Sequence, residues 1–269
     1  MSKKIVAIGG GENGRLNRND NSRYPYETGS MDKEIIRLTE KEKPNFLFLG
    51  HAGLQFQESY FEVMFNIYNK MYGCECKILH SDDLADMNKT QELINWADII
   101  YEGGGNTKAM MQLWRDTGLD KMLIQAYEEG KVMCGVSAGA NCWFKSCSSD
   151  AMQIELNDPN APLIKVDGLG LVDGLFTPHC DERNRLSHLK DLLQTENMVG
   201  IAVSNCAAIV IVDNDYRLVT SDASFHGIEA YGVRAYWQNG EYYQENIEQS
   251  NEFKNLNDLL FISKNMKGK

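Results

Sequence analysis

Short apolar stretches alternate with amphipathic stretches through the first half of the chain. The apolar stretches hold few polar positions and end at glycine or at polar residues, which is typical of strands buried on both faces of a parallel sheet. We predict such strands at Lys4–Ile8 and at residues 45–49, 76–79, 98–101 and 131–136.

The stretches between these strands carry apolar residues at helical spacing. In residues 59–71, for example, Tyr60, Met64 and Ile67 fall on one helical face, and Gly73 follows as a C-terminal stop. We predict helices at residues 32–43, 59–71, 90–96, 108–115 and 119–129. This alternation of strand and helix predicts an α/β fold with a mostly parallel sheet and helices on both of its faces.

The pattern changes after Pro178. Residues 185–193 read as a helix, and residues 209–212 and 216–220 flank Asp213-Asn214-Asp215 as a hairpin. Residues 233–237 and 241–244 flank Gln238-Asn239-Gly240, whose Asn-Gly pair favours a tight hairpin turn. We therefore expect antiparallel hairpins late in the chain, and a terminal helix over residues 249–269 with a frayed, basic end.

Composition narrows the class of protein. The sequence has 269 residues, 43% hydrophobic and 24% charged, with no repeat or linker, so we expect one domain over residues 1–269. A formal net charge of −11 repels phosphate backbones and argues against a nucleic-acid partner. No apolar stretch approaches the roughly 20 residues that a spanning helix needs, so we expect no membrane partner. The seven cysteines lack paired metal spacing, and the first apolar run is too short for a signal peptide, so we expect reduced thiols and a cytoplasmic location.

The pentapeptide Gly135-Val136-Ser137-Ala138-Gly139 follows the fifth predicted strand. A serine in this pattern lies on a strained turn between a strand and a helix, which exposes its hydroxyl above the sheet edge. The helix that follows points its free N–H groups at the reacting carbonyl, where they hold developing negative charge. Ser137 is therefore the candidate nucleophile.

Two further features suit a serine hydrolase. Gly103-Gly104-Gly105-Asn106 ends the fourth predicted strand, at the same sheet edge, and its N–H groups could form an oxyanion hole with that of Ala138. Pro178-His179 ends an apolar run and is followed at once by polar residues, which makes His179 the candidate base. His51, after the second predicted strand, is the reserve candidate.

Gly103-Gly104-Gly105-Asn106-Thr107, Gly135-Val136-Ser137-Ala138-Gly139-Ala140-Asn141 and Pro178-His179, in this order and spacing, resemble peptidase E, the aspartyl dipeptidase family that also includes cyanophycinase. The likeness covers roughly residues 4 to 235. It implies a three-layer, flavodoxin-like fold, as in class I glutamine amidotransferases. It also implies a serine-histidine-acid triad that attacks an amide of a small peptide through an acyl-enzyme on Ser137.

The resemblance also assigns roles to individual residues. Ser137 is the nucleophile, His179 the general base and then acid, and Gly104 with Ala138 supply the oxyanion N–H groups. The residues expected to contact substrate are Gly105, Asn106, Asn141, Asp150 and Glu182. Specificity for aspartate would need a cation, for which Lys145, Arg183 and Arg185 are near the motifs. Asp181 and Glu182 would instead suit a substrate amine.

One position departs from the family pattern. Where the family has a glutamate after Gly200-Ile201, this chain has Asn205. An asparagine can orient an imidazole but cannot stabilise the imidazolium by charge. Either Asn205 is a weaker third member, or another acid serves, for which the candidates are Asp150, Asp181, Glu182 and Asp222, or the triad is damaged.

Other functions remain open at this point. An esterase or amidase of the α/β-hydrolase class shares the pentapeptide, although there the acid precedes the histidine in the chain. A binding protein that kept the fold but lost activity would also fit Asn205. The run Gly9-Gly10-Gly11-Glu12-Asn13-Gly14 is a weak match to a dinucleotide-binding turn. We expect no cofactor and no metal, a small peptide as the partner, and a monomer or homodimer.

Overall fold

The computed structural model describes residues 1–17, 20 and 22–262. Its larger sheet has eight strands in the order β14-β11-β10-β1-β5-β4-β2-β3. Five of them run parallel: β1 (Lys4–Ile8), β5 (Val132–Val136), β4 (Ile99–Glu102), β2 (Asn45–Phe48) and β3 (Glu75–Ile78). The remaining three are antiparallel additions beyond β1: β10 (Ala207–Val212), β11 (Asp215–Thr220) and β14 (Lys254–Asn255).

Helices cover both faces of this sheet because successive side chains of each strand point to opposite faces. Val6 and Phe48 share one apolar cluster with residues of α1 (Gly29–Leu38) and α2 (Gln57–Phe65), which a π-helical turn extends over Asn66–Met71. Ile5 and Leu47 point the other way, toward α3 (Met87–Trp96), α4 (Thr107–Thr117) and α5 (Leu119–Glu128). Short 3-10 turns cover His51–Phe56 and Ser81–Ala85.

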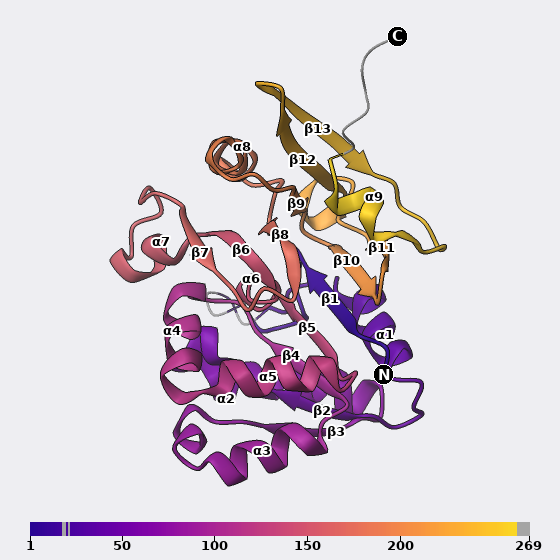
Figure 1. Ribbon diagram of the computed structural model, residues 1–269. Coiled ribbons are helices and arrows are strands. Elements are labelled where there is room, and N and C mark those ends of the chain that lie inside the picture. Colours follow the sequence, from indigo (N-terminus) through magenta and orange to yellow (C-terminus); the bar gives the residue numbers. More distant parts are fainter. Residues whose placement is uncertain (18–19, 21, 263–269) are drawn as a thin grey trace.

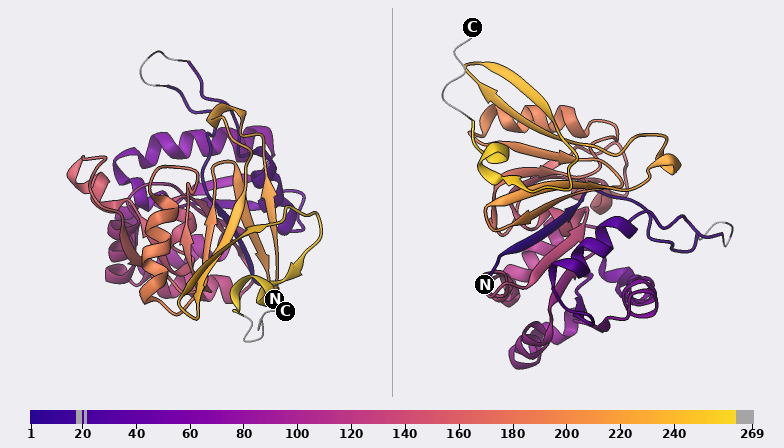
Figure 2. Two further views of the ribbon diagram at one scale, coloured as in Figure 1. Left: turned by 90° about the horizontal axis from the view of Figure 1, so that it is seen from above. Right: turned by 90° about the vertical axis from the view of Figure 1, so that its right-hand side faces the viewer.

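A second sheet of six strands packs above the first, as the side view in Figure 2 shows. Its order is β13 (Glu241–Ile247), β12 (Gly232–Gln238), β9 (Gly200–Val203), β8 (Val172–Thr177), β6 (Phe144–Ser149) and β7 (Ile164–Asp167). Helix α8 (Arg185–Thr195) covers its outer face (Figure 1). The remaining short elements are α6 (Ala138–Asn141), α7 (Ala151–Leu156), the turn Ser224–His226 and α9 (Leu256–Leu260).

The two sheets share one continuous apolar cluster. It joins Ile5 and Leu47 of the first sheet to Phe144, Phe176 and Ile201 of the second. The carboxyl ends of β1 and β5 therefore meet those of β8 and β9 at the boundary between the sheets. There the backbone N–H of Ser137 donates to the carbonyl of Ile8, and the backbone N–H of His179, after β8, donates to the carbonyl of Gly9, after β1.

The structure confirms a mixed α/β fold with helices on both faces of a parallel sheet, and each predicted strand and hairpin is present. A single flavodoxin-like sheet in three layers does not describe it, because residues 144–203 and the last hairpin build the second sheet. In the predicted terminal helix only Leu256–Leu260 is helical among the described residues, and residues 263–269 lie outside them. None of the helices in the described part of the chain is both long and apolar enough to cross a membrane.

Candidate active site

Ser137 lies on the predicted strained turn between β5 and α6. Its backbone has φ 55° and ψ −112°, a conformation that an ordinary residue adopts only when its surroundings enforce it. The flanking glycines are needed because the turn passes close to β4: a Cβ on Gly139 would lie 2.1 Å from the carbonyl oxygen of Glu102. Ala138 opens α6, and the first N–H groups of a helix have no partner within it. The turn thus presents a hydroxyl beside free backbone donors.

His179 and Asn205 lie side by side because they follow neighbouring parallel strands. β8 and β9 pair up to Thr177 opposite Ala202, so the loops after both strands leave the sheet together. The His179 ring reaches the Asn205 side chain, with 2.9 Å between Nδ1 and Oδ1. The two residues are 26 positions apart in the sequence, and the register of β8 and β9 brings them together.

The Asn205 amide has a defined orientation. Its Nδ2 donates to Oδ2 of Asp181 at 2.9 Å, and its backbone N–H donates to Oδ1 of the same carboxylate at 2.8 Å. The amide oxygen therefore faces His179, which must donate from Nδ1, leaving Nε2 free to accept a proton. Glu182 adds a second carboxylate, with Oε1 3.4 Å from Nδ1 of His179. Negative charge thus stands behind and beside the imidazole although its direct partner is neutral.

The other two candidate acids lie elsewhere. Asp150 pairs with the buried guanidinium of Arg185 at 2.8 Å. Asp222 accepts a hydrogen bond from the backbone N–H of Ser224 at 3.0 Å and so holds a surface turn. Geometry therefore favours Asp181 and Glu182 as the acids nearest to His179.

The first glycine run fits against the His179–Asn205 pair. Gly10 has its Cα so close that a Cβ there would lie 2.1 Å from Oδ1 of Asn205 and 2.4 Å from the His179 ring. The backbone N–H of His179 donates to the Gly9 carbonyl at 3.2 Å, and that of Cys206 donates to the Gly10 carbonyl at 3.0 Å. Close packing therefore explains this glycine run, and a dinucleotide-binding turn, the weak alternative, is not needed to explain it.

Glu102 fixes the loop that carries Gly104. It is fully buried at the end of β4, and its carboxylate accepts hydrogen bonds from the backbone N–H groups of His51, Ala52 and Gly103 at 3.2, 3.1 and 2.9 Å. Burial raises the pKa of Glu102 to about 8, although the three N–H donors act in the opposite direction. These bonds tie the loop after β2 to the start of the Gly103-Gly104 turn.

One cavity of about 960 Å³ brings the predicted catalytic residues together. Its wall includes Gly10, Gly104, Ser137, His179, Glu182 and Asn205. A Cβ on Gly104 would lie 3.6 Å from that of Ser137, so this backbone is next to the nucleophile. No hydrogen bond joins the Ser137 hydroxyl to His179 within the described residues. Such bonds are often long in ligand-free enzymes and tighten when substrate binds.

Four of the residues expected to contact substrate are not among those that line the cavity: Gly105, Asn106, Asn141 and Asp150. Gly105 packs directly against the loop after β2. Asn106 caps α4 by accepting from the Ala109 N–H at 3.0 Å, and Asn141 donates to Thr107 Oγ1 at 3.1 Å. The Asn106 and Asn141 side chains therefore stabilise the start of α4, next to the glycine turn.

The cavity cations also differ from those predicted. Within the described residues, Arg15 and Arg23, from the loop before α1, line the cavity, whereas Lys145, Arg183 and Arg185 do not. Lys145 lies at the surface in an exposed ion pair, and Arg183 borders a separate cavity. No local pattern in the sequence marks Arg15 or Arg23, because the fold alone carries their loop to the site.

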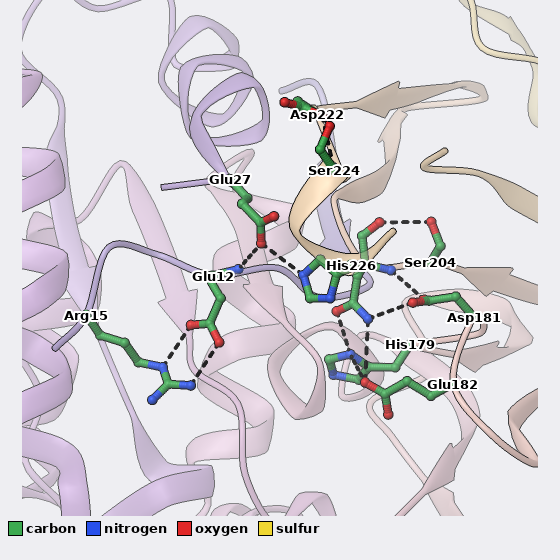
Figure 3. A network of polar contacts seen from close by, with 11 residues as sticks. Glu12, Arg15, Glu27, His179, Asp181, Glu182, Ser204, Asp222, Ser224 and His226 are labelled. Carbon is green, nitrogen blue, oxygen red and sulfur yellow. Dashed lines mark hydrogen bonds and ion pairs between the residues drawn. The ribbon is translucent and has the colours of Figure 1, made fainter. Parts of the chain in front are cut away.

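The cavity wall holds charges of both signs. Glu12, Glu62 and Glu182 contribute carboxylates. Glu12 and Arg15 form a two-bond ion pair, with both nitrogen–oxygen distances at 2.9 Å (Figure 3). A site of this kind can bind an ammonium group at one place and a carboxylate at another.

His51, the reserve candidate for the base, is buried away from the cavity. Its Nε2 donates to the Leu79 carbonyl at 3.0 Å, and its Nδ1 accepts from the Trp114 indole at 2.9 Å. Burial lowers the pKa of His51 to about 4, so the ring is neutral and serves packing.

The chain is similar to several known peptidases. The profile of peptidase family S51 matches residues 20–219. The uncharacterized peptidase YgaJ of Bacillus subtilis is 30% identical over 236 residues, which are 86% of this chain and 92% of that protein. A peptidase from an acI-B1 Actinobacterium has a similar structure, with a TM-score of 0.65 at 19% identity over 95% of this chain and 97% of its own. A candidate peptidase E protein from Listeria monocytogenes has a TM-score of 0.59 at 18% identity over 82% of this chain and 100% of its own.

Proposed function

Because this chain belongs to peptidase family S51, the peptidase E family of serine-type peptidases, we propose that it is an exopeptidase that cleaves short peptides through an acyl-enzyme on Ser137. The observation that carries the proposal is the chain of contacts from His179 through Asn205 to Asp181, with His179 and Asn205 lining the same cavity as the strained Ser137 turn.

The proposed reaction begins with proton transfer. Nε2 of His179 takes the Ser137 proton as Oγ attacks the scissile carbonyl carbon. The carbonyl oxygen becomes an oxyanion, for which the backbone N–H groups of Gly104 and Ala138 are the proposed donors. Collapse of the intermediate breaks the C–N bond, and His179 gives its proton to the leaving amine.

Water then completes the cycle. His179 takes a proton from a water molecule, which attacks the acyl carbonyl and releases the acid product with Ser137 restored. During both steps the imidazolium faces the Asn205 oxygen, while Asp181 polarises that amide from the far side. Two hydrogen bonds thus replace the direct carboxylate contact that the family has at this position.

The cavity supports a small substrate. Its volume of about 960 Å³ is within the range of small-ligand clefts. Carboxylates and arginines in the same wall match a short peptide with a free amino group and a free carboxylate, and Glu182 beside His179 is the proposed partner for the amino group.

The test is a panel of dipeptides (Asp-X, Glu-X, Lys-X and Gly-X) hydrolysed by the wild type and Ser137→Ala, with amino-acid release measured by mass spectrometry. Ser187→Ala, on the exposed face of α8, is the matched control. We expect turnover by the wild type and the control and none by Ser137→Ala. Equal turnover by Ser137→Ala, or none by the wild type on any peptide, would contradict the proposal.

A further inference from the structure

Three side chains of metal-binding type converge beside the cavity, apart from the proposed catalytic residues, and one of them, His226, lines its wall. They are Glu27, Cys206 and His226, from the loop before α1, the turn after β9 and the turn Ser224–His226, and one ligand atom of each lies within 4.8 Å of the others. Figure 3 shows the His226 ring directed at the Glu27 carboxylate, close to the His179 network.

A thiol, an imidazole and a carboxylate are the ligands that zinc and similar divalent cations prefer. In a tetrahedral zinc site, ligand atoms of this kind lie about 3.3–3.6 Å apart, given their bond lengths to the metal. Nε2 of His226 now lies 2.9 Å from Oε2 of Glu27, so only small side-chain movements separate the present arrangement from a ligating one.

The Glu27 carboxylate is incompletely satisfied. Its side chain is 5% exposed, and Oε2 accepts from His226 and from the Glu12 backbone N–H at 2.9 Å. The other oxygen, Oε1, is buried and has no N–H or O–H partner among the described residues, and the Cys206 thiol offers the carboxylate only a weak donor. Buried carboxylate oxygens are rarely left without a partner, and a cation would satisfy this one.

The backbone holds the ligands in place. Cys206 is fully buried in a left-handed conformation with φ 60°, and the Ser221 N–H donates to its carbonyl at 2.8 Å. His226 ends a short turn, borders the cavity and is partly exposed. An ion held by these three residues is therefore reached from the cavity, where water can supply a fourth ligand.

We propose that Glu27, Cys206 and His226 form a binding site for one zinc-class divalent cation. Binding replaces the thiol proton of Cys206 by the metal, and that proton passes to solvent. Cys206 directly follows Asn205 in the chain, yet none of the three ligands belongs to the proposed peptidase machinery. Its failure is therefore distinguishable from that of the proposed function.

The test is titration of the chelator-treated full chain with Co²⁺, followed by the thiolate-to-cobalt charge-transfer absorbance and by displacement with Zn²⁺. The variants are Cys206→Ser and His226→Gln. The matched controls are Cys76→Ser, a partly exposed thiol on β3, and His80→Gln, a histidine in an exposed pair with Glu58. Ser137→Ala is titrated as well, so that the readout is independent of peptidase activity.

We expect one equivalent of Co²⁺ with a thiolate band in the wild type, the controls and Ser137→Ala. The band should be absent in Cys206→Ser, and affinity should fall at least tenfold in His226→Gln. If Cys206→Ser does not fold, the proposal is tested by the other pair of variants: Co²⁺ affinity should fall at least tenfold in His226→Gln and stay unchanged in His80→Gln. No thiolate band in the wild type, or equal binding by His226→Gln and the wild type, would overturn the proposal.

Discussion

Asn205→Asp would place a carboxylate beside His179, where the resemblance to peptidase E implies an acid, and at first sight it would restore the triad. The structure predicts damage instead. The Asn205 amide nitrogen lies 2.9 Å from Oδ2 of Asp181 and 3.5 Å from Oε1 of Glu182, and both contacts depend on an N–H donor. A carboxylate there faces two other carboxylates.

The size of the effect follows from the distance. Two unit charges 2.9 Å apart repel by about 6 kcal/mol at an effective dielectric constant near 20. Uptake of a proton limits the cost: protonating a carboxyl at pH 8 costs about 5 kcal/mol, since it normally ionises near pH 4. Asp181 is partly exposed and can move toward water, which lowers the cost further. We expect Asn205→Asp to lose about 2–4 kcal/mol of unfolding free energy at pH 8.

The assay is urea unfolding of the wild type and Asn205→Asp at pH 8 and pH 5, with kcat/KM on the preferred dipeptide at pH 8. In Asn205→Asp, the two facing carboxylates at positions 205 and 181 bind a proton more readily in the folded state than in the unfolded state. The loss of stability is therefore largest at pH 8 and shrinks as the pH falls toward 4.

The double variant Asn205→Asp with Asp181→Asn is the matched control, because it exchanges amide and carboxylate and keeps one charge. We expect its stability to be within about 1 kcal/mol of the wild type, and its kcat/KM to be at least as high. The reasoning is refuted if Asn205→Asp alone is as stable and as active at pH 8 as the wild type, since the contact with Asp181 would then not exist in solution.

Two other substitutions test the surroundings of the site. Gly10→Ala puts a methyl group into the His179–Asn205 contact, so kcat/KM should fall at least about 100-fold, with about 1–3 kcal/mol of lost stability, and unchanged kinetics would count against the packing. Burial lowers the pKa of His51 to about 4 in the folded state, so the unfolded state binds a proton more readily. In urea unfolding, the wild type should therefore lose up to about 3 kcal/mol of stability as the pH falls from 6.5 to 4, and His51→Gln should lack this loss. Identical pH profiles for the two proteins would show that His51 is not buried neutral.

Local patterns were enough to predict the parallel strands, because these strands are buried on both faces and stand between clear breaks. They did not reveal the second sheet. Phe144–Ser149 and Ile164–Asp167 are short and carry polar residues, and they pair with each other and, for the first of them, with Val172–Thr177. Their pairing with neighbouring strands defines them as strands, because neither has a clear periodicity of its own.

The candidate site, too, could be predicted only in part from local patterns. Ser137 and His179 follow from local motifs, and Asn205 from its place after β9. The conformation of the turn after β8 determines which acid contacts Asn205. From the sequence alone, Asp181 was therefore one of several candidate carboxylates. Glu27 and His226 gave no signal at all, because ligands this far apart in sequence show no metal-site spacing.

The central claim is that His179 activates Ser137. The most direct measurement is the rate at which a fluorophosphonate labels the protein, with the adduct located by peptide mass spectrometry, for the wild type, His179→Ala and Ser187→Ala. The account predicts a single adduct on Ser137, formed at the same rate in Ser187→Ala and at least about 100 times more slowly in His179→Ala. No adduct on Ser137, or an adduct that forms as fast without His179, would contradict it.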